Sequence, residues 1–141
     1  MGQFGPVTAL TQRYGVEGVH DIDVYLEHGG YEGLKAALEL EPAEIIQIVK
    51  DSGLRGRGGA GFPTGMKWSF VAQDTGKPVY VVCNADEGEP GTFKDRYVME
   101  LRPHLLLEGV LIAMRFAEAA EGYIYLREEY ATSRHRLQAG I

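Results

Sequence analysis

A glycine-rich stretch, SGLRGRGGAGFPTGMKW (52–68), combines three kinds of residue that could act together on a ligand. Glycines let a backbone approach a ligand closely and point N–H groups at it. The positively charged side chains, which would attract phosphate groups, are Arg55, Arg57 and Lys67. The aromatic side chains, which could stack on a flat ring, are Phe62 and Trp68, with Phe70 two positions after the stretch. A surface loop with tight turns is the alternative, and the combination of all three kinds favours a nucleotide.

Neither of two familiar phosphate-binding motifs fits this stretch. GRGGAG (56–61) satisfies G-x-G-x-x-G, but the Rossmann fingerprint needs a strand before the first glycine and a helix starting within the motif. Here a helical pattern precedes the loop, and Pro63 with further glycine turns follows, so we expect no helix at Gly61. The phosphate-loop pattern fails because the lysine of GFPTGMK (61–67) stands one place late and no hydroxyl residue follows it.

A second stretch, NADEGEPG (84–91), follows a candidate strand, VYVVC (79–83). That run is β-branched and aromatic without polar alternation, which is typical of a central parallel strand covered on both faces. Ligands of open α/β sheets bind outside the carboxyl ends of such strands. The three carboxylates of the stretch are those of Asp86, Glu87 and Glu89. These carboxylates could form a solvated turn or a site for a hard cation, although the spacing of a calcium loop is absent. They could instead accept hydrogen bonds from a flavin, and Asn84 could both donate and accept such bonds.

The remaining pattern predicts an α/β fold with a parallel sheet. Helices are expected over 31–40, from Pro42 to a stop at Gly53, from Pro103 to about Ala120 with Gly122 closing it, and over 128–138. Strands are expected over 79–83 and 123–126, the second with two buried faces. Two strands alone cannot make a stable parallel core, so the chain reads as part of a larger domain. Residues 1–20 lack a clear period and are expected to form an extended arm, and residues 21–141 the domain.

Composition narrows the class of protein. The 141 residues are 45% hydrophobic and 24% charged, which is ordinary for a globular chain. The net charge of −6 argues against a nucleic-acid partner. The apolar run 105–120 is broken by Glu108 and Arg115, so we expect a buried helix and no direct membrane insertion. Cys83 is the single cysteine, which excludes an internal disulfide and a four-cysteine cluster within this chain. No leader pattern stands at the N-terminus, and a cytoplasmic setting is expected.

Together, SGLRGRGGAGFPTGMKWSF (52–70) and CNADEGEPGTFKDR (83–96) resemble the NADH-binding, FMN-carrying subunit of respiratory NADH–quinone oxidoreductase, complex I. The flanking DVYLEHGGYEGLKAAL and RPHLLLEGVLIAM fit as well, so the likeness covers roughly residues 20–141. The diaphorase subunits of NAD-reducing hydrogenases and of NAD-dependent formate dehydrogenases are similar too. The sequence does not separate these families.

The resemblance implies a Rossmann-like parallel sheet with flanking helices, of which this chain would be the incomplete N-terminal part. It implies an NADH dehydrogenase flavoprotein subunit in which FMN lies on the glycine loop and NADH stacks over the flavin. Hydride would pass from NADH to FMN, and electrons would continue to iron–sulfur clusters and quinone. A [4Fe–4S] cluster is expected in full-length relatives, but its cysteine ligands are absent here. The partners would be the other components of the enzyme, through which the protein would lie peripheral to the inner membrane.

The resemblance also implies residue roles. The residues expected to bind the cofactors are Gly56, Arg57, Gly58, Gly59, Ala60, Gly61, Phe62, Pro63, Thr64, Gly65, Lys67, Phe70, Asn84, Asp86 and Glu87. Among them, Lys67 would lie near the FMN phosphate, and Phe62 and Phe70 would sandwich the adenine of NADH. The ribityl chain and the ring of FMN would form hydrogen bonds with three side chains, those of Asn84, Asp86 and Glu87. Glu89 would be the catalytic residue, beside the nicotinamide nucleotide.

A non-catalytic interaction fragment is the remaining alternative, because family members are about three times as long. The chain ends before the second half of the family's FMN site. We therefore expect the 141 residues by themselves to bind FMN weakly, if at all.

Overall fold

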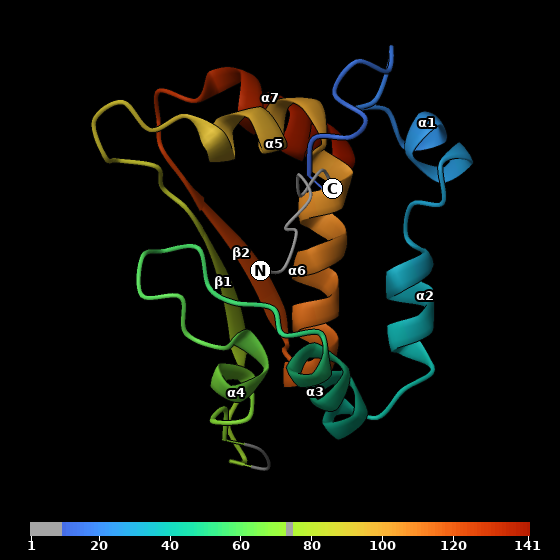
Figure 1. The fold of residues 1–141 in the computed structure, drawn as a ribbon, viewed down its shortest axis with the longest axis vertical. Helices are drawn as coiled ribbons and strands as arrows, with labels where there is room; N and C mark the ends of the chain where they lie inside the picture. The colour runs from blue at the N-terminus through green and yellow to red at the C-terminus, as the bar shows by residue number, and fades with distance from the viewer. Residues whose placement is uncertain (1–9, 73–74) are drawn as a thin grey trace, which may run out of the picture. The chain divides into compact units, whose positions relative to one another are not determined.

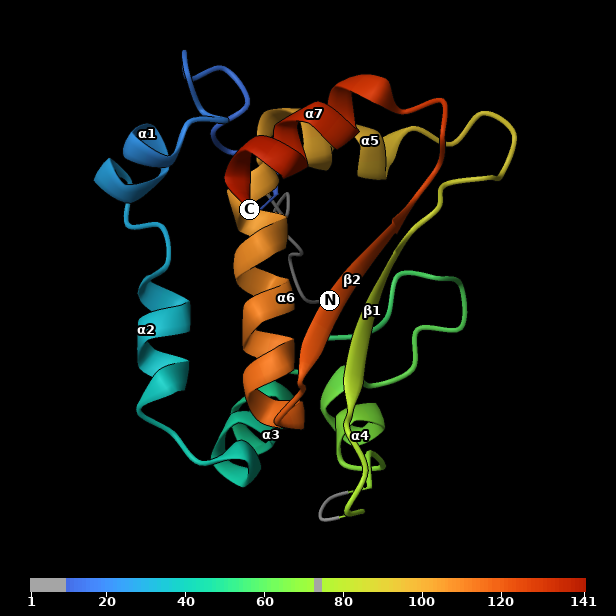
Figure 2. The ribbon, with the colours of Figure 1, turned by 180° about the vertical axis from the view of Figure 1, so that it is seen from behind.

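A computed structural model describes residues 10–72 and 75–141. In this part of the chain, seven helices and two strands follow one another (Figures 1 and 2). They are α1 (Ile22–Glu27), α2 (Glu32–Leu38), α3 (Pro42–Asp51), α4 (Thr64–Trp68), β1 (Tyr80–Ala85), α5 (Lys94–Leu101), α6 (Pro103–Ala117), β2 (Glu121–Leu126) and α7 (Ala131–Gly140). Residues 1–9 of the expected arm lie outside the described residues, and residues 10–20 form successive turns instead of an extended segment.

The two strands are neighbours in one parallel sheet, joined by a crossover through α5 and α6 (Figure 1). Just before the strands begin, the amide of Ala120 donates to the carbonyl of Val79 at 2.8 Å. The alternation of helices and parallel strands confirms the predicted α/β class.

The prediction that both strands are buried on both faces is wrong. Successive side chains of a strand point to opposite faces, and here one face is covered while the other is open. Val81 packs against a hydrophobic core, whereas Val82 is 62% exposed. On β2, Tyr123 and Tyr125 are also exposed. Within residues 10–72 and 75–141, the side chains on the second face of this two-stranded sheet stay exposed.

The described residues cluster into two compact units, and each is described by itself. The first unit holds residues 10–31, 84–108 and 125–141. In it α5 packs against α7, and both views show these helices side by side (Figures 1 and 2). Its fully or nearly fully buried side chains include Met99, Leu107, Ser133 and Leu137.

The second unit holds residues 32–72, 75–83 and 109–124 and contains the glycine-rich stretch. Its core consists of Ala37, Ile45, Phe116 and Ala117. The start of α3 confirms the prediction made from Pro42, and a capping box between Glu41 and Glu44 secures that end. Ile48 is 55% exposed, so the buried stripe of α3 is narrower than the run of isoleucines suggests.

One helix boundary and two whole helices differ from what the sequence predicts. Helix α6 ends at Ala117, before Gly122, which lies in β2. The reason is Glu118, whose φ of 48° takes the backbone out of the helix. Helices α1 and α5 were not expected from the sequence. Helix α5 begins at Lys94, and the group that stabilises its start is the carboxylate of Glu87, several residues earlier.

Candidate functional site

The glycine loop, residues 54–64, is a short antiparallel ribbon that leads from α3 to α4 (Figure 1). The amide of Gly56 donates to the carbonyl of Phe62 at 2.9 Å, and the amide of Thr64 donates to the carbonyl of Leu54 at 2.8 Å. Arg55 and Pro63 form the bridge between these two bonds. The pairing holds residues 57–61 at the tip of the ribbon.

The tip of the glycine loop presents bare backbone. Residues 57–60 are all exposed. A β-carbon built on Gly58 would meet no atom within 4 Å among the residues that the structure describes. Gly59 has a φ of 124°, a backbone conformation that residues with a β-carbon rarely adopt. Gly58 therefore has no packing reason to be glycine, whereas Gly59 has a conformational one.

The two arginines of the glycine loop shape the loop itself. Arg55 Nη1 donates to the carbonyl of Gly61 at 3.0 Å, and Arg57 Nη1 donates to the carbonyl of Arg55 at 2.9 Å. Each guanidinium keeps further donors on an exposed side chain. Lys67 is exposed in the last turn of α4. Three cationic side chains of one unit are thus exposed, and their binding of a phosphate group stays a prediction.

Gly65 has a structural reason to be glycine. A β-carbon at this position would lie 2.4 Å from the backbone nitrogen of Lys50 and 2.7 Å from its Cα. The close approach of α4 to α3 depends on this missing side chain. The short helix α4 also begins at Thr64, the last residue of the loop, where the proline and glycine pattern had suggested further turns.

The aromatic side chains of the stretch divide into two groups. Trp68 stacks on Phe116 in the core, with ring centroids 4.1 Å apart and planes 11° apart. Phe62 and Phe70 remain on the surface, 44% and 69% exposed. Their rings lie side by side, 6.3 Å between centroids and tilted by 50°. This places the predicted pair together, but the two rings are tilted and not parallel, as a sandwich around a flat base would require, and the adenine sandwich stays a prediction.

In the acidic turn, residues 84–91, the three carboxylates have different surroundings. Asp86 and Glu89 are exposed, as is Asn84, whose Oδ1 accepts from the amide of Asp86 at 3.1 Å. Glu87 is only 4% exposed. The turn therefore offers a ligand two carboxylates and keeps the third for the protein.

Glu87 caps the N-terminus of α5. Its Oε1 accepts from the amide of Asp95 at 2.9 Å, and its Oε2 accepts from the amide of Arg96 at 3.2 Å. The hydroxyl of Tyr130 also donates to Oε2, at 3.2 Å. Burial by itself would raise the pKa of Glu87, but these three hydrogen bonds and the charge of Lys94 hold the pKa below its usual range.

Sequence reasoning missed two residues that contact the acidic turn. Arg127 Nη1 donates to the backbone carbonyl of Glu87 at 2.9 Å, and its Nε lies 3.9 Å from Asp86 Oδ1. The second is Tyr130, which precedes α7 and binds the Glu87 carboxylate. No local pattern could have found them, because they lie about forty residues downstream and meet the turn only through the pairing of β1 and β2.

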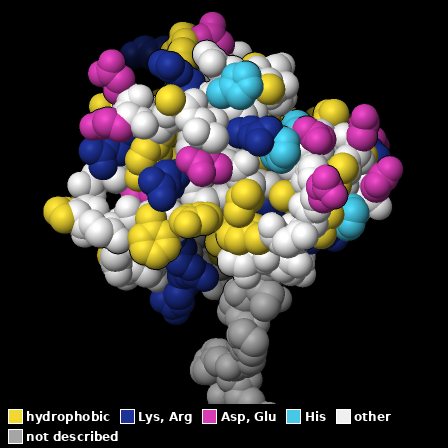
Figure 3. Space-filling view, turned by 90° about the horizontal axis from the view of Figure 1, so that it is seen from above, with side chains coloured by type: hydrophobic (Ala, Val, Ile, Leu, Met, Phe, Trp, Pro, Cys, Tyr) yellow, Lys and Arg dark blue, Asp and Glu magenta, His cyan; other side chains and the backbone are white. Residues whose placement is uncertain are grey.

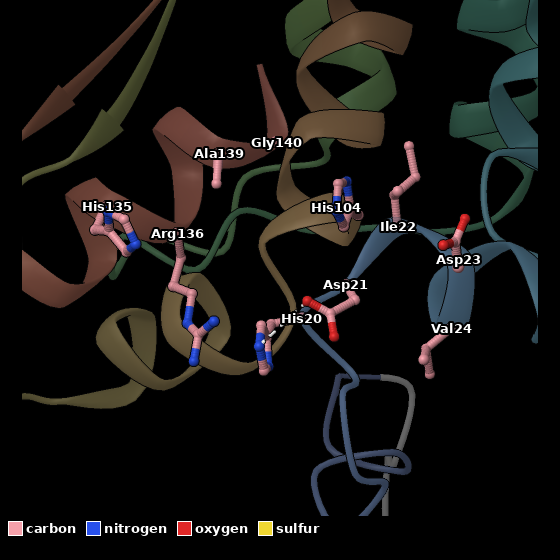
Figure 4. Close-up of a pocket in the computed structure, with 10 residues that line it drawn as sticks. All are labelled: His20, Asp21, Ile22, Asp23, Val24, His104, His135, Arg136, Ala139 and Gly140. Atoms are coloured by element: carbon pink, nitrogen blue, oxygen red, sulfur yellow. Dashed lines mark ion pairs between the residues drawn. The ribbon is translucent and has the colours of Figure 1, made fainter.

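A separate pocket in the first unit gathers three histidines (Figure 4). It has a volume of about 500 Å³ and is lined by His20, Asp21, Ile22, Asp23, Val24, His104, His135, Arg136, Ala139 and Gly140. Burial lowers the pKa of His104, and its Nδ1 lies 3.0 Å from the hydroxyl of Tyr31. In residues 10–72 and 75–141, no group of three or more His, Cys, Asp or Glu side chains could hold a metal ion.

Charges of both signs mark the molecular surface. The face in Figure 3 carries Lys and Arg side chains interspersed with Asp and Glu, and histidines among them. No helix of the described residues is both long and apolar enough to cross a membrane.

The glycine loop belongs to the second unit and the acidic turn to the first, and their meeting around one ligand stays a prediction.

Comparison with known proteins finds relatives over a range that includes both the glycine loop and the acidic turn. The model of the Nuo51 FMN-binding domain matches residues 49–141. The chain is 52% identical over 139 residues to the F 2 subunit of NADH-quinone oxidoreductase from Rhizobium meliloti (strain 1021), covering 98% of this chain and 32% of that protein. It is 55% identical over 123 residues to the F subunit of NADH-quinone oxidoreductase from Aquifex aeolicus (strain VF5), covering 87% and 29%.

Among solved structures, the chain is similar to a chain of an NAD⁺-reducing [NiFe]-hydrogenase in the air-oxidized state. The TM-score is 0.70 at 38% sequence identity, over 96% of this chain and 21% of that one. The fold is accordingly a partial Rossmann-like α/β fold, as the sequence predicts. The chain belongs to the Nuo51 FMN-binding domain family. It spans about a third of the length of the curated relatives that it matches.

Proposed function

We propose that this chain is the N-terminal part of an FMN- and NADH-binding domain and contributes to NADH dehydrogenation. The observation that carries the proposal is the bare backbone around Gly58, in a chain whose family is named for FMN binding. Glycine at this position fills no structural need within the described residues, so a close ligand explains it. FMN, when bound, would supply the redox chemistry that accepts hydride from NADH, while the protein supplies position and electrostatics.

Each group of the glycine loop has a role in this proposal. The backbone at Gly56 and Gly58 lets a flat ring approach, and the guanidinium of Arg57 together with the ammonium of Lys67 attracts the FMN phosphate. Phe62 and Phe70 offer exposed aromatic faces to a nucleotide base.

The acidic turn supplies the acceptors. Exposed Asn84 and Asp86 are available to the ribityl and ring donors of FMN, and exposed Glu89 to the nicotinamide nucleotide. We assign Glu87 to the anchoring of the turn, because its carboxylate is buried and bound to the chain's own amides and hydroxyl.

NADH–quinone oxidoreductase is the favoured enzyme, since the two relatives from that enzyme share 52% and 55% of the aligned residues with this chain. The similarity to the hydrogenase chain, at 38% identity, supports the diaphorase alternative. In either enzyme the chain would work with partner subunits and deliver electrons to their iron–sulfur clusters. The favoured enzyme would place it peripherally at a membrane.

The test is a whole-length chimera, in which this chain replaces the matching third of the Rhizobium meliloti relative. FMN affinity is measured by quenching of flavin fluorescence in the unsubstituted chimera and in Gly58→Ala. We expect FMN to bind the unsubstituted chimera and to bind Gly58→Ala at least about tenfold more weakly, because the added methyl occupies the space of the ring.

The matched control is Gly15→Ala, which adds a methyl in equally open space far along the chain from the glycine loop. It should leave FMN affinity unchanged. A folded chimera that binds no FMN would refute the proposed function, and equal affinity of Gly58→Ala would refute the role of the bare backbone. NADH-dependent bleaching of the bound flavin then reports hydride transfer.

A further inference from the structure

Arg127 contacts the acidic turn through backbone and side chain together. Its Nη1 holds the carbonyl of Glu87 at 2.9 Å, and its Nε lies 3.9 Å from the carboxylate of Asp86. Its Nη2 lies 3.3 Å from Glu129 Oε1, which balances the guanidinium charge on the other side. Arg127 directly follows β2, and the acidic turn follows β1, so the pairing of the two strands brings these groups together.

Tyr130 gives a second attachment. Its hydroxyl donates to the Glu87 carboxylate at 3.2 Å, while its ring lies under the guanidinium of Arg127 at 5.8 Å and that of Arg96 at 5.9 Å. A cation over an aromatic face is attracted by the quadrupole of the ring. Arg127 and Tyr130 thus hold both the backbone and the side chain of Glu87, and they also contact each other.

The contacts of Arg127 are directed at the turn and not at a hydrophobic core. The side chain keeps about a third of its surface in water, and it binds polar groups of the acidic turn and of its own segment. An arginine in such a place adds little to core burial. It contacts the backbone carbonyl of Glu87 and the neighbouring carboxylate of Asp86, which both belong to the acidic turn.

We propose that Arg127 and Tyr130 are positioning residues that hold the acidic turn in the shape that binds FMN. The proposal rests on the proposed function, in which Asp86 and Glu89 contact the cofactors. Neither Arg127 nor Tyr130 touches the ligand in this proposal. Their effect reaches it through Glu87, whose carbonyl and carboxylate they bind, and through the ion pair with Asp86.

The test uses the whole-length chimera with Arg127→Gln, Arg127→Lys and Tyr130→Phe. Arg134→Gln is the matched control, since Arg134 is an exposed arginine on α7 and loses the same charge. For each variant we would measure the melting temperature without FMN, the affinity for FMN, and the visible circular dichroism of the flavin at saturation. The last readout reports the surroundings of the bound ring and does not respond to stability alone.

We expect Arg127→Gln to bind FMN about tenfold more weakly and to change the flavin dichroism, and Tyr130→Phe to show about a threefold loss. Arg127→Lys keeps a charged donor and should recover part of the affinity, while Arg134→Gln should match the unsubstituted chimera. Variants with lower melting temperatures but unchanged affinity and dichroism would overturn the proposal, because the residues would then be merely structural.

The remaining results complete the test and distinguish this proposal from the proposed function. If Arg127→Gln does not fold, Arg127→Lys and Tyr130→Phe decide, and normal FMN affinity in both would overturn the positioning role. If the unsubstituted chimera folds but binds no FMN, the proposed function fails and this inference fails with it. Normal FMN binding by the chimera and all its variants leaves the proposed function intact and refutes the positioning role alone.

Discussion

The indole of Trp68 lies flat on the ring of Phe116, with centroids 4.1 Å apart and planes 11° apart. This contact joins α4, which follows the glycine loop, to α6, which comes after β1 and α5 in the sequence. Trp68 is therefore a structural residue, although it stands among the aromatic residues that the sequence offered as ligand contacts.

Trp68→Ala should lower the free energy of unfolding by about 3 kcal/mol, because it removes a large side chain from the packed core. Phe70→Ala is the control, since Phe70 is 69% exposed, and it should change the free energy by about 0.5 kcal/mol or less. Urea unfolding of the chain followed by far-UV circular dichroism gives both values. Similar losses for the two variants would show that the stack is not the stabilising contact.

Gly65→Ala and Gly58→Ala should separate the two uses of glycine in the stretch. At Gly65 the new methyl would meet the Lys50 backbone at 2.4 Å, so α3 and α4 must move apart and the melting temperature should drop by several degrees. At Gly58 the methyl meets open space, and the melting temperature without FMN should stay within about a degree. A loss of stability in Gly58→Ala would mean that the loop tip packs on the protein.

Glu87 should make stability fall in acid. Its pKa is lowered in the folded chain, so the ionised carboxylate stabilises the fold above its ordinary pKa of 4.5. That contribution disappears as pH falls from about 4.5 through the lower pKa of the folded state. Glu87→Gln should accordingly be less stable than the unsubstituted chain at about pH 7, and the gap should close toward about pH 3 in urea unfolding. A difference in stability between the two proteins that does not change with pH would show that packing, and not the charge of the carboxylate, gives the stabilisation.

His104 should make the stability of the fold depend on pH in a higher range than Glu87 does. Burial lowers its pKa from 6.5, an effect opposed by Asp21 and reinforced by His20, so the folded chain favours the neutral ring. The stability that this gives is complete above pH 6.5 and is lost as pH falls from there through the lowered pKa. His104→Gln, which cannot be protonated, should lose less stability between about pH 7.5 and about pH 5.5, as measured by thermal unfolding. Equal slopes in both proteins would contradict the assignment.

The local elements of this protein could be read from the sequence. Helix α3 starts at Pro42 and ends before Gly53 because a proline without an amide donor and a glycine with positive φ act on their own neighbours. The strand expected over 79–83 and found at Tyr80–Ala85, and the glycine loop, likewise follow from residue types at consecutive positions. The family was equally predictable, because the resemblance was seen in two contiguous motifs, and both lie within residues 49–141, which the family model matches.

The tertiary structure alone decided which of three adjacent carboxylates is kept by the protein. Asp86, Glu87 and Glu89 are equivalent in the sequence, yet only Glu87 is buried, because the amides at the start of α5 and the hydroxyl of Tyr130 converge on it. The same contacts explain why α5 was missed. The carboxylate that caps α5 belongs to Glu87, outside the helix, and it is held in turn by Tyr130, forty-three positions downstream of Glu87. A local sequence pattern cannot predict such a partner, because only the fold brings it near.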